Sequence, residues 1–129
     1  MKRILIVEDD SNLRELYKNA FSGANYVVFD EGDVSKALRI LGEKEFEVIL
    51  LDLLFPSTDG VEVIKTLRLS NSLNNQTHIV VLTNVSADEK ITEALESGAN
   101  KYLFKAQFTP KAIVKEVDAL LQNQENPSN

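Results

Sequence analysis

Short runs of apolar residues alternate along the chain with longer segments in which apolar residues recur every three or four positions. The runs have the length of strands and are rich in β-branched and aromatic side chains, which favour β-structure. We therefore predict five strands, at residues 4–7, 26–29, 48–51, 79–82 and 102–104.

The segments that follow these runs have the spacing of amphipathic helices, in which one side of the helix is apolar. Each predicted strand is followed by one such segment. The apolar positions of the five segments are Leu13, Leu16, Tyr17, Ala20 and Phe21; Val34, Ala37, Leu38 and Leu41; Val61, Ile64 and Leu67; Ile91, Ala94 and Leu95; and Ile113, Val114, Val117, Leu120 and Leu121.

Residues that favour helix ends support the same boundaries. Gly98 is placed to end the fourth helix, because glycine readily adopts the left-handed conformation found there. The residues expected to begin helices are Ser11, Asp33, the capping box formed by Ser86 and Glu89, and Thr109 followed by Pro110.

Strands that alternate with helices in this way predict a parallel sheet covered on both faces. Right-handed connections then give an α/β fold, a three-layer sandwich, with the flavodoxin-like strand order 2-1-3-4-5 as the candidate. We expect one domain over residues 1–121, a polar tail at 122–129 and a mobile, Asn- and Ser-rich loop at 70–76.

Composition removes several kinds of chemistry. The 129 residues suit one domain and include no cysteine, which excludes disulfides, thiolate metal sites and a cysteine nucleophile. His78 is the only histidine, so a zinc site built from several histidines is excluded as well. Because His78 begins the fourth predicted strand, we expect it to be structural rather than a phosphohistidine.

The net charge of −6 disfavours direct binding to nucleic acid, which usually requires a basic surface. No apolar run approaches the roughly 20 residues that a membrane span needs. The apolar run near the start is too short for a signal peptide. We expect a cytoplasmic protein that contacts neither membrane nor nucleic acid.

Polar side chains stand where four of the predicted strands end. Each alone could be a turn, a helix cap or a solvated residue, but parallel strands would bring them to one edge of the sheet. Carboxylates suit Mg²⁺, an aspartate can accept a phosphoryl group, and a cation and a hydroxyl can neutralise its oxygens. The residues are Glu8, Asp9 and Asp10 after the first strand, Asp52 after the third, Thr83 after the fourth and Lys105 after the fifth.

With these segments the chain resembles the receiver domain of two-component response regulators, the CheY-like family. The resemblance covers residues 2–121. It is carried by ILIVEDD at 4–10, LDLLFP at 51–56 with Asp59 and Gly60, VLT at 81–83, and GANKYLFK at 98–105.

The resemblance implies a phosphorylation site. Asp52 would accept the phosphoryl group, and Lys105 would pair with the phosphate and with the carboxylate of Asp52. Glu8, Asp9, Asp52 and the backbone carbonyl of Leu54 would hold Mg²⁺ as the cofactor.

The resemblance also implies a switch and partners. Thr83 would move towards the phosphoryl group and Tyr102 would turn inward, although Tyr102 could equally be an ordinary strand aromatic. The phosphoryl group would come from a sensor histidine kinase or a phosphotransfer protein. A downstream protein would bind the face formed by the fourth helix, fifth strand and fifth helix. The domain would be regulatory and not an enzyme, because it would catalyse only its own phosphorylation and dephosphorylation.

Several positions depart from the family's pattern. Ala106 replaces the usual proline, so the Lys105–Ala106 bond is either trans with a rearranged loop or a strained cis bond. Asn84 stands where a small residue is common, and would narrow access to Asp52. Leu54 and Val85 cannot orient an attacking water by hydrogen bonding, which predicts a long-lived aspartyl phosphate.

Three other functions remain to be compared with this one. A degenerate receiver would act as a scaffold without phosphorylation. An aspartate-nucleophile phosphatase would carry a second aspartate at position 54, where leucine stands. A flavin mononucleotide carrier would need a phosphate-binding loop where Glu8, Asp9 and Asp10 lie.

Overall fold

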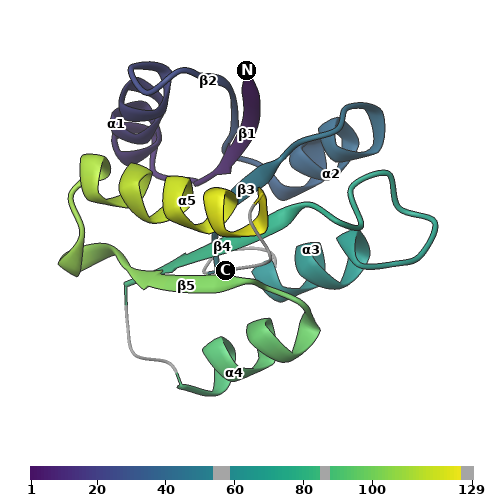
Figure 1. Ribbon diagram of the computed structural model, residues 1–129. Coiled ribbons are helices and arrows are strands. Elements are labelled where there is room, and N and C mark those ends of the chain that lie inside the picture. Colours follow the sequence, from purple (N-terminus) through teal and green to yellow (C-terminus); the bar gives the residue numbers. More distant parts are fainter. Residues whose placement is uncertain (54–58, 85–87, 126–129) are drawn as a thin grey trace.

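The computed structural model describes residues 1–53, 59–84 and 88–125. Within these residues, strands and helices alternate as the hydrophobic pattern predicts (Figure 1). The elements are β1 (Lys2–Val7), α1 (Ser11–Ser22), β2 (Tyr26–Glu31), α2 (Val34–Glu43), β3 (Val48–Asp52), α3 (Gly60–Leu67), β4 (His78–Thr83), α4 (Asp88–Ser97), β5 (Lys101–Phe104), the 3-10 turn η1 (Lys105–Gln107) and α5 (Pro110–Glu125).

The five strands form one parallel sheet in the order β2-β1-β3-β4-β5. Helices α1 and α5 cover one face, and α2, α3 and α4 cover the other (Figure 1). The predicted α/β three-layer sandwich and its strand order are therefore confirmed. Because all strands are parallel, their carboxyl ends lie at the same edge of the sheet.

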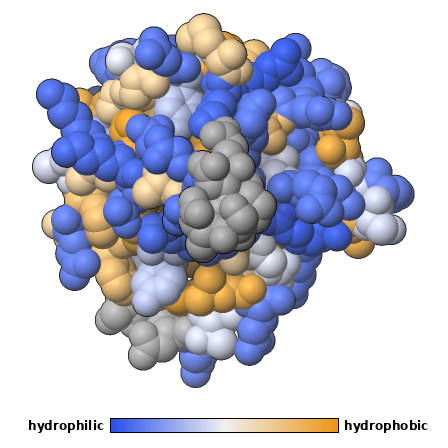
Figure 2. Space-filling model, viewed as in Figure 1, coloured by the Kyte–Doolittle hydropathy of each residue, from blue (hydrophilic) through white to orange (hydrophobic). Residues whose placement is uncertain are grey.

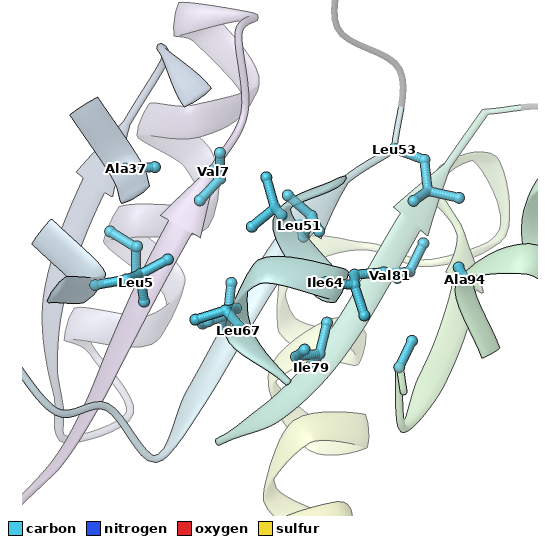
Figure 3. Close-up of a cluster of buried hydrophobic side chains, with 14 of the residues drawn as sticks. Leu5, Val7, Ala37, Leu51, Leu53, Ile64, Leu67, Ile79, Val81 and Ala94 are labelled. Atoms are coloured by element: carbon cyan, nitrogen blue, oxygen red, sulfur yellow. The ribbon is translucent and has the colours of Figure 1, made fainter. Parts of the chain in front are cut away.

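The core consists of two layers, one on each face of the sheet. Successive strand residues point to opposite faces, so Leu5 and Val7 pack towards α2 and α3, while Ile4 and Ile6 pack towards α1 and α5. Figure 3 shows the first layer, in which side chains of β1, β3 and β4 meet those of the covering helices. All four of these β1 side chains are fully buried, which fixes the register of the strand that leads into the acidic residues.

The first helix begins differently from our prediction. We expected Ser11 to cap α1, but Ser11 is its first residue and Asp10 is the cap. Oδ1 of Asp10 accepts hydrogen bonds from the backbone N–H groups of Asn12, at 2.9 Å, and Leu13, at 3.1 Å. A carboxylate also suits the positive end of the helix dipole, which explains why Asp10 takes this position.

Other predicted helix ends are confirmed. Asp33 caps α2 by accepting the N–H of Lys36, and Thr109 caps α5 by accepting the N–H of Ala112. Gly98 follows α4 with a φ of 119°, a conformation that side chains disfavour. The predicted cap Ser86 lies outside the described residues.

The loop after α3, which we expected to be mobile, is held by one buried amide. Nδ2 of Asn74 donates to the carbonyl oxygens of Leu41, at 2.6 Å, and Lys44, at 2.8 Å. Its Oδ1 accepts from the N–H of Phe46 at 2.8 Å. Asn74 therefore ties the end of α2 and the start of the β3 segment to this loop.

Two further expectations concern the ends of elements. His78 begins β4, as predicted. Helix α5 continues to Glu125, so it includes the first residues of the segment 122–129, which we expected to be a polar tail. None of the described helices is long and apolar enough to cross a membrane. The face of the molecule in Figure 2 is mostly hydrophilic, with apolar residues in small groups.

Candidate functional site

The strand register brings the predicted site residues to one edge of the sheet. Asp52 is the last residue of β3 and pairs with Leu82 of β4, directly before Thr83. Glu8 follows β1 at once, and its N–H donates to the carbonyl of Glu31 in β2 at 3.1 Å. Lys105 directly follows Phe104, the last residue of β5.

These residues surround a cavity of about 240 Å³, which we call the acidic pocket. Its walls come from the loop after β1, from the first turn of α1 and from the carboxyl ends of β3, β4 and β5. It is lined by Glu8, Asp9, Asp10, Leu13, Asp52, Asn84 and Lys105. Asn84 lies in this wall, and its effect on access to Asp52 stays a prediction.

Lys105 joins the two buried carboxylates of the acidic pocket. Its Nζ atom lies 2.6 Å from Oε1 of Glu8 and 3.0 Å from Oδ2 of Asp52. The side chains of Lys105, Glu8 and Asp52 are only 7%, 2% and 6% exposed, respectively. Removal of charges from water is costly unless they are paired at close range, and this geometry supplies the pairing.

Burial and hydrogen bonding act against each other on the pKa values of Glu8 and Lys105. Burial raises the pKa of Glu8 to about 7, while the hydrogen bond from Lys105 opposes that rise. Burial alone would lower the pKa of Lys105, but its hydrogen bonds to Glu8 and Asp52 outweigh burial and the pKa is raised. The ammonium therefore stays charged at neutral pH beside two closely spaced carboxyl groups.

The carboxylates also form a candidate metal site. Glu8, Asp9 and Asp52 each offer an oxygen, and these oxygens lie within 4.8 Å of one another. Three carboxylates against one ammonium leave an excess of negative charge, and Mg²⁺ prefers oxygen ligands together with water. The residues present therefore fit the ion. Leu54, whose carbonyl was the fourth predicted ligand, lies outside the described residues.

Thr83 and Tyr102 lie on neighbouring strands but differ in environment. Thr83 is buried at the end of β4, beside Phe104 in the register with β5. Tyr102 is 41% exposed, and its ring packs edge-on against that of Phe104, with centroids 5.6 Å apart. The ring of Tyr102 therefore lies at the surface of the domain.

The bond after Lys105 resolves an alternative that the sequence left open. There is no cis peptide bond in the described parts of the chain, so the Lys105–Ala106 bond is trans. Residues Lys105–Gln107 form a single 3-10 turn. The trans bond is therefore the correct alternative, and Lys105 still reaches both carboxylates.

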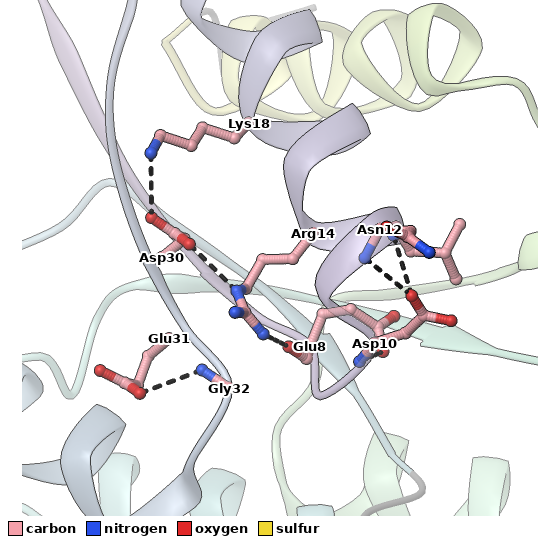
Figure 4. Close-up of polar contacts among 9 residues, drawn as sticks. Glu8, Asp10, Asn12, Arg14, Lys18, Asp30, Glu31 and Gly32 are labelled. Carbon is pink, nitrogen blue, oxygen red and sulfur yellow. Dashed lines mark hydrogen bonds and ion pairs between the residues drawn. The ribbon is translucent and has the colours of Figure 1, made fainter.

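Sequence reasoning missed Arg14. Its Nη1 atom donates to the backbone carbonyl of Glu8 at 2.7 Å, and its Nε atom donates to Oδ2 of Asp30 at 3.0 Å (Figure 4). A single arginine on the polar side of a helix carries no signal of such a contact. The only hint is its position, one helical turn after the acidic residues.

A second missed contact lies beside the site. Asp59 caps α3 by accepting the N–H of Val61 at 2.9 Å, and its other oxygen accepts from Nζ of Lys90 in α4 at 2.6 Å. The described start of α3 is therefore linked to α4 by an ion pair. The preference of aspartate for helix caps could have identified half of this arrangement.

Comparison with known proteins agrees with the geometry. The family model described as "Response regulator receiver domain" matches residues 4–118. The chain is 34% identical over 125 residues to the "DNA-binding response regulator MtrA" of Mycolicibacterium smegmatis, covering 97% of this chain and 53% of the relative. It is 34% identical over 119 residues to the "Transcriptional regulatory protein SrrA" of Staphylococcus aureus, covering 92% and 47%.

Solved structures give the same result. A CheY-like receiver domain protein from Methanospirillum hungatei JF-1 has a TM-score of 0.89 at 24% identity, covering 98% of each chain, which supports the fold alone. The chemotaxis response regulator CheY4 of Vibrio cholerae has a TM-score of 0.83 at 28% identity, covering 92% of this chain and 98% of its own. The chain spans about half the length of the curated relatives that it matches. With the family model matching most of its length, it belongs to the response regulator receiver domains of two-component signalling.

Proposed function

We propose that this receiver domain accepts a phosphoryl group on Asp52, with Mg²⁺ bound beside it, and that the modification changes its affinity for a protein partner. The observation that carries the proposal is the bridge from Lys105 to both Glu8 and Asp52. An ammonium within 3.0 Å of the acceptor carboxylate is placed to neutralise phosphoryl oxygens as they arrive.

The proposed reaction is a transfer between two residues. The P–N bond of a phosphohistidine breaks while a carboxylate oxygen of Asp52 forms a P–O bond. The departing imidazole keeps the electron pair of the broken bond and takes a proton from solvent. The donor would be a sensor histidine kinase or a phosphotransfer protein.

Glu8, Asp9 and Asp52, together with the carbonyl of Leu54, would hold Mg²⁺. The ion would supply the positive charge that lets an anionic phosphoryl group approach three carboxylates. Lys105 would exchange part of its contact with Asp52 for the phosphoryl oxygens. The domain would act on no other substrate, so it is a regulatory domain that catalyses its own modification.

Thr83 and Tyr102 would transmit the change. The hydroxyl of Thr83 would turn towards the phosphoryl group, and the exposed ring of Tyr102 would fill the space that Thr83 leaves. The binding face for the downstream partner would then be α4, β5 and α5. Phosphate would act by shifting the balance between two arrangements of this face.

The proposed domain spans residues 1–121, followed by a tail at 122–129 of which the first part continues α5. We place it in the cytoplasm, where its phosphoryl donor would be. We propose contact with proteins rather than with nucleic acid for this part of the chain, because its net charge is −6.

Two other functions are weaker. A scaffold that works without phosphorylation would not need a buried lysine joined to two buried carboxylates. A phosphatase with an aspartate nucleophile would need a second acid two positions later, where Leu54 stands. The bridge made by Lys105 favours the phosphoacceptor over the scaffold, and Leu54 favours it over the phosphatase.

The proposal is tested by intact-protein mass spectrometry after incubation with acetyl phosphate and Mg²⁺. We expect one phosphoryl adduct on the wild type, and none on the Asp52→Asn variant or without Mg²⁺. Asp33→Asn is the matched control, because Asp33 caps α2 and does not line the acidic pocket. A folded wild type that gains no adduct, or an adduct that survives in Asp52→Asn, would overturn the proposal.

A further inference from the structure

We infer that Arg14 is a positioning residue for the Mg²⁺ site: it holds the peptide bond between Glu8 and Asp9 so that both carboxylates point into the acidic pocket. The inference rests on the proposed function, which places Mg²⁺ there. Arg14 lies on α1 and would act through the backbone of Glu8 without touching the ion.

The guanidinium is held at two points. Nη1 of Arg14 donates to the carbonyl of Glu8 at 2.7 Å, and Nε donates to Oδ2 of Asp30, near the end of β2, at 3.0 Å (Figure 4). Because the guanidinium is planar and its donors have a fixed geometry, two contacts fix its direction. The carbonyl of Glu8 is therefore tied to β2 through a rigid group.

The contact completes a clamp on Glu8. The N–H of Glu8 donates to the carbonyl of Glu31 at 3.1 Å, and this bond fixes the peptide before Glu8. Arg14 binds the carbonyl after it, which belongs to the peptide that leads to Asp9. Without Arg14, that peptide would lose the described contact that orients it. The carboxylate oxygens of Glu8 and Asp9, on either side of the peptide, would then move away from each other.

Gly32 provides the room for this arrangement. A Cβ atom there would lie 2.5 Å from Nη1 of Arg14 and 3.5 Å from the carbonyl oxygen of Glu8. The φ of Gly32 is not positive, so its backbone does not require glycine. An alanine at this position would push the guanidinium away while leaving Arg14 in the sequence.

The direction of the change in Mg²⁺ affinity distinguishes a positioning role of Arg14 from an effect of its charge alone. The charge of Arg14 repels a cation, so its removal would strengthen Mg²⁺ binding if charge alone mattered. The same holds for Lys18, whose Nζ lies 3.7 Å from Oδ1 of Asp30. Positioning predicts the opposite for Arg14 and no comparable change for Lys18.

The experiment is calorimetric titration of Mg²⁺ into the full chain, at a temperature where each variant is folded by circular dichroism. We expect Arg14→Gln and Gly32→Ala to bind Mg²⁺ roughly tenfold more weakly than the wild type, as is typical for groups that orient metal ligands. Arg14→Lys, which keeps a donor without the fork, should fall between. Lys18→Gln, the matched control, should bind as tightly as the wild type or more tightly.

The double variant Arg14→Gln/Gly32→Ala gives the sharpest result. It should be no weaker than Arg14→Gln alone, because both changes act through the same guanidinium. Additive losses, or a folded Arg14→Gln that binds as well as the wild type, would overturn the inference. If Arg14→Gln does not fold, Gly32→Ala decides in the same way. A wild type that binds no Mg²⁺ would instead overturn the proposed function.

Discussion

Nζ of Lys90 lies 2.6 Å from Oδ2 of Asp59, so an ion pair joins the residue that caps α3 to the first turn of α4. The hydrogen bond from Lys90 and that from the N–H of Val61 lower the pKa of the Asp59 carboxyl. In return, Asp59 raises the pKa of Lys90. The contact links the start of α3, which lies close to the backbone of Asp52, to a helix of the proposed partner face.

This pair predicts a pH-dependent difference in stability between the wild type and Asp59→Asn. Asparagine still caps a helix, so the variant removes the charge and keeps the cap. Because the folded pKa of Asp59 lies below its ordinary 3.8, the charged form favours the folded state. The wild type should be more stable than the variant at pH 7, and this advantage should disappear as the pH falls through the folded pKa.

Urea unfolding at pH 7, 5, 4 and 3 measures this advantage. It should also shrink at high salt and in a Lys90→Gln background, because the pair is partly exposed. An advantage that is as large at pH 3 as at pH 7, or is unaffected by Lys90→Gln, would contradict the prediction.

Gly60 should be intolerant of alanine. A Cβ atom there would lie 2.8 Å from the carbonyl oxygen of Leu53 and 3.0 Å from that of Asp52, both of them backbone atoms. We expect Gly60→Ala to lower the free energy of unfolding by about 1–3 kcal/mol, as in other overpacked sites. It should also slow phosphorylation by acetyl phosphate, because α3 would be displaced from the end of β3.

Gly42→Ala is the matched control for this effect. Gly42 lies in α2, and a Cβ atom added there would meet nothing within 4 Å, so alanine should raise stability by about 0.5–1 kcal/mol. Chemical unfolding of both variants measures the difference. Equal changes in the free energy of unfolding at the two glycines would show that helix propensity, and not contact with β3, determines the effect of Gly60→Ala.

Replacement of Asn74 should lower the stability of the fold more than most substitutions of polar residues. Its amide satisfies the carbonyls of Leu41 and Lys44 and the N–H of Phe46, and it is buried. We expect Asn74→Ala to lower the free energy of unfolding by about 2–4 kcal/mol, because these buried groups lose their partner. The neighbouring Asn75→Ala should change stability by less than about 0.5 kcal/mol. Urea unfolding of both variants tests this, and similar losses would refute it.

Mg²⁺ should stabilise the folded chain. An ion that binds only the folded state adds about 2.7 kcal/mol at 100 times its dissociation constant. We expect thermal unfolding to shift upward with Mg²⁺ in the wild type and in Asp33→Asn. The shift should be much smaller in Asp9→Asn and Asp52→Asn, which lose a ligand charge. An equal shift in all four proteins would mean that Mg²⁺ acts elsewhere.

The sequence was sufficient for the fold because each level of the pattern agrees with the others. Residues that alternate in β1, such as Ile4 and Leu5, are apolar on both sides, which is typical of a strand between two layers of helices. The strand ends then place Glu8, Asp52 and Lys105 at one edge without any information on side chains. The choice of Ser11 as a cap was wrong because both Asp10 and Ser11 suit that position, and only the path of the chain distinguishes them.

The remaining contacts depend on side-chain directions that no local pattern encodes. Arg14 reaches Glu8 only because Gly32 leaves room beside it, a relation between residues on different elements. Asn74 resembles any polar loop residue in the sequence, yet it is buried by segments on both sides. The trans bond at Ala106 could be stated from the sequence only as one of two alternatives.

The salt bridge between Glu8 and Lys105 spans 97 positions of the chain, and the one between Asp52 and Lys105 spans 53. During synthesis, both carboxylates leave the ribosome well before the lysine that pairs with them. Until β5 docks, the two carboxylates lack this cation, and their mutual repulsion opposes closure of the edge of the sheet around them. We therefore expect this edge of the sheet to be completed late in folding, and a polypeptide that ends before Lys105 lacks the cation that pairs with both carboxylates.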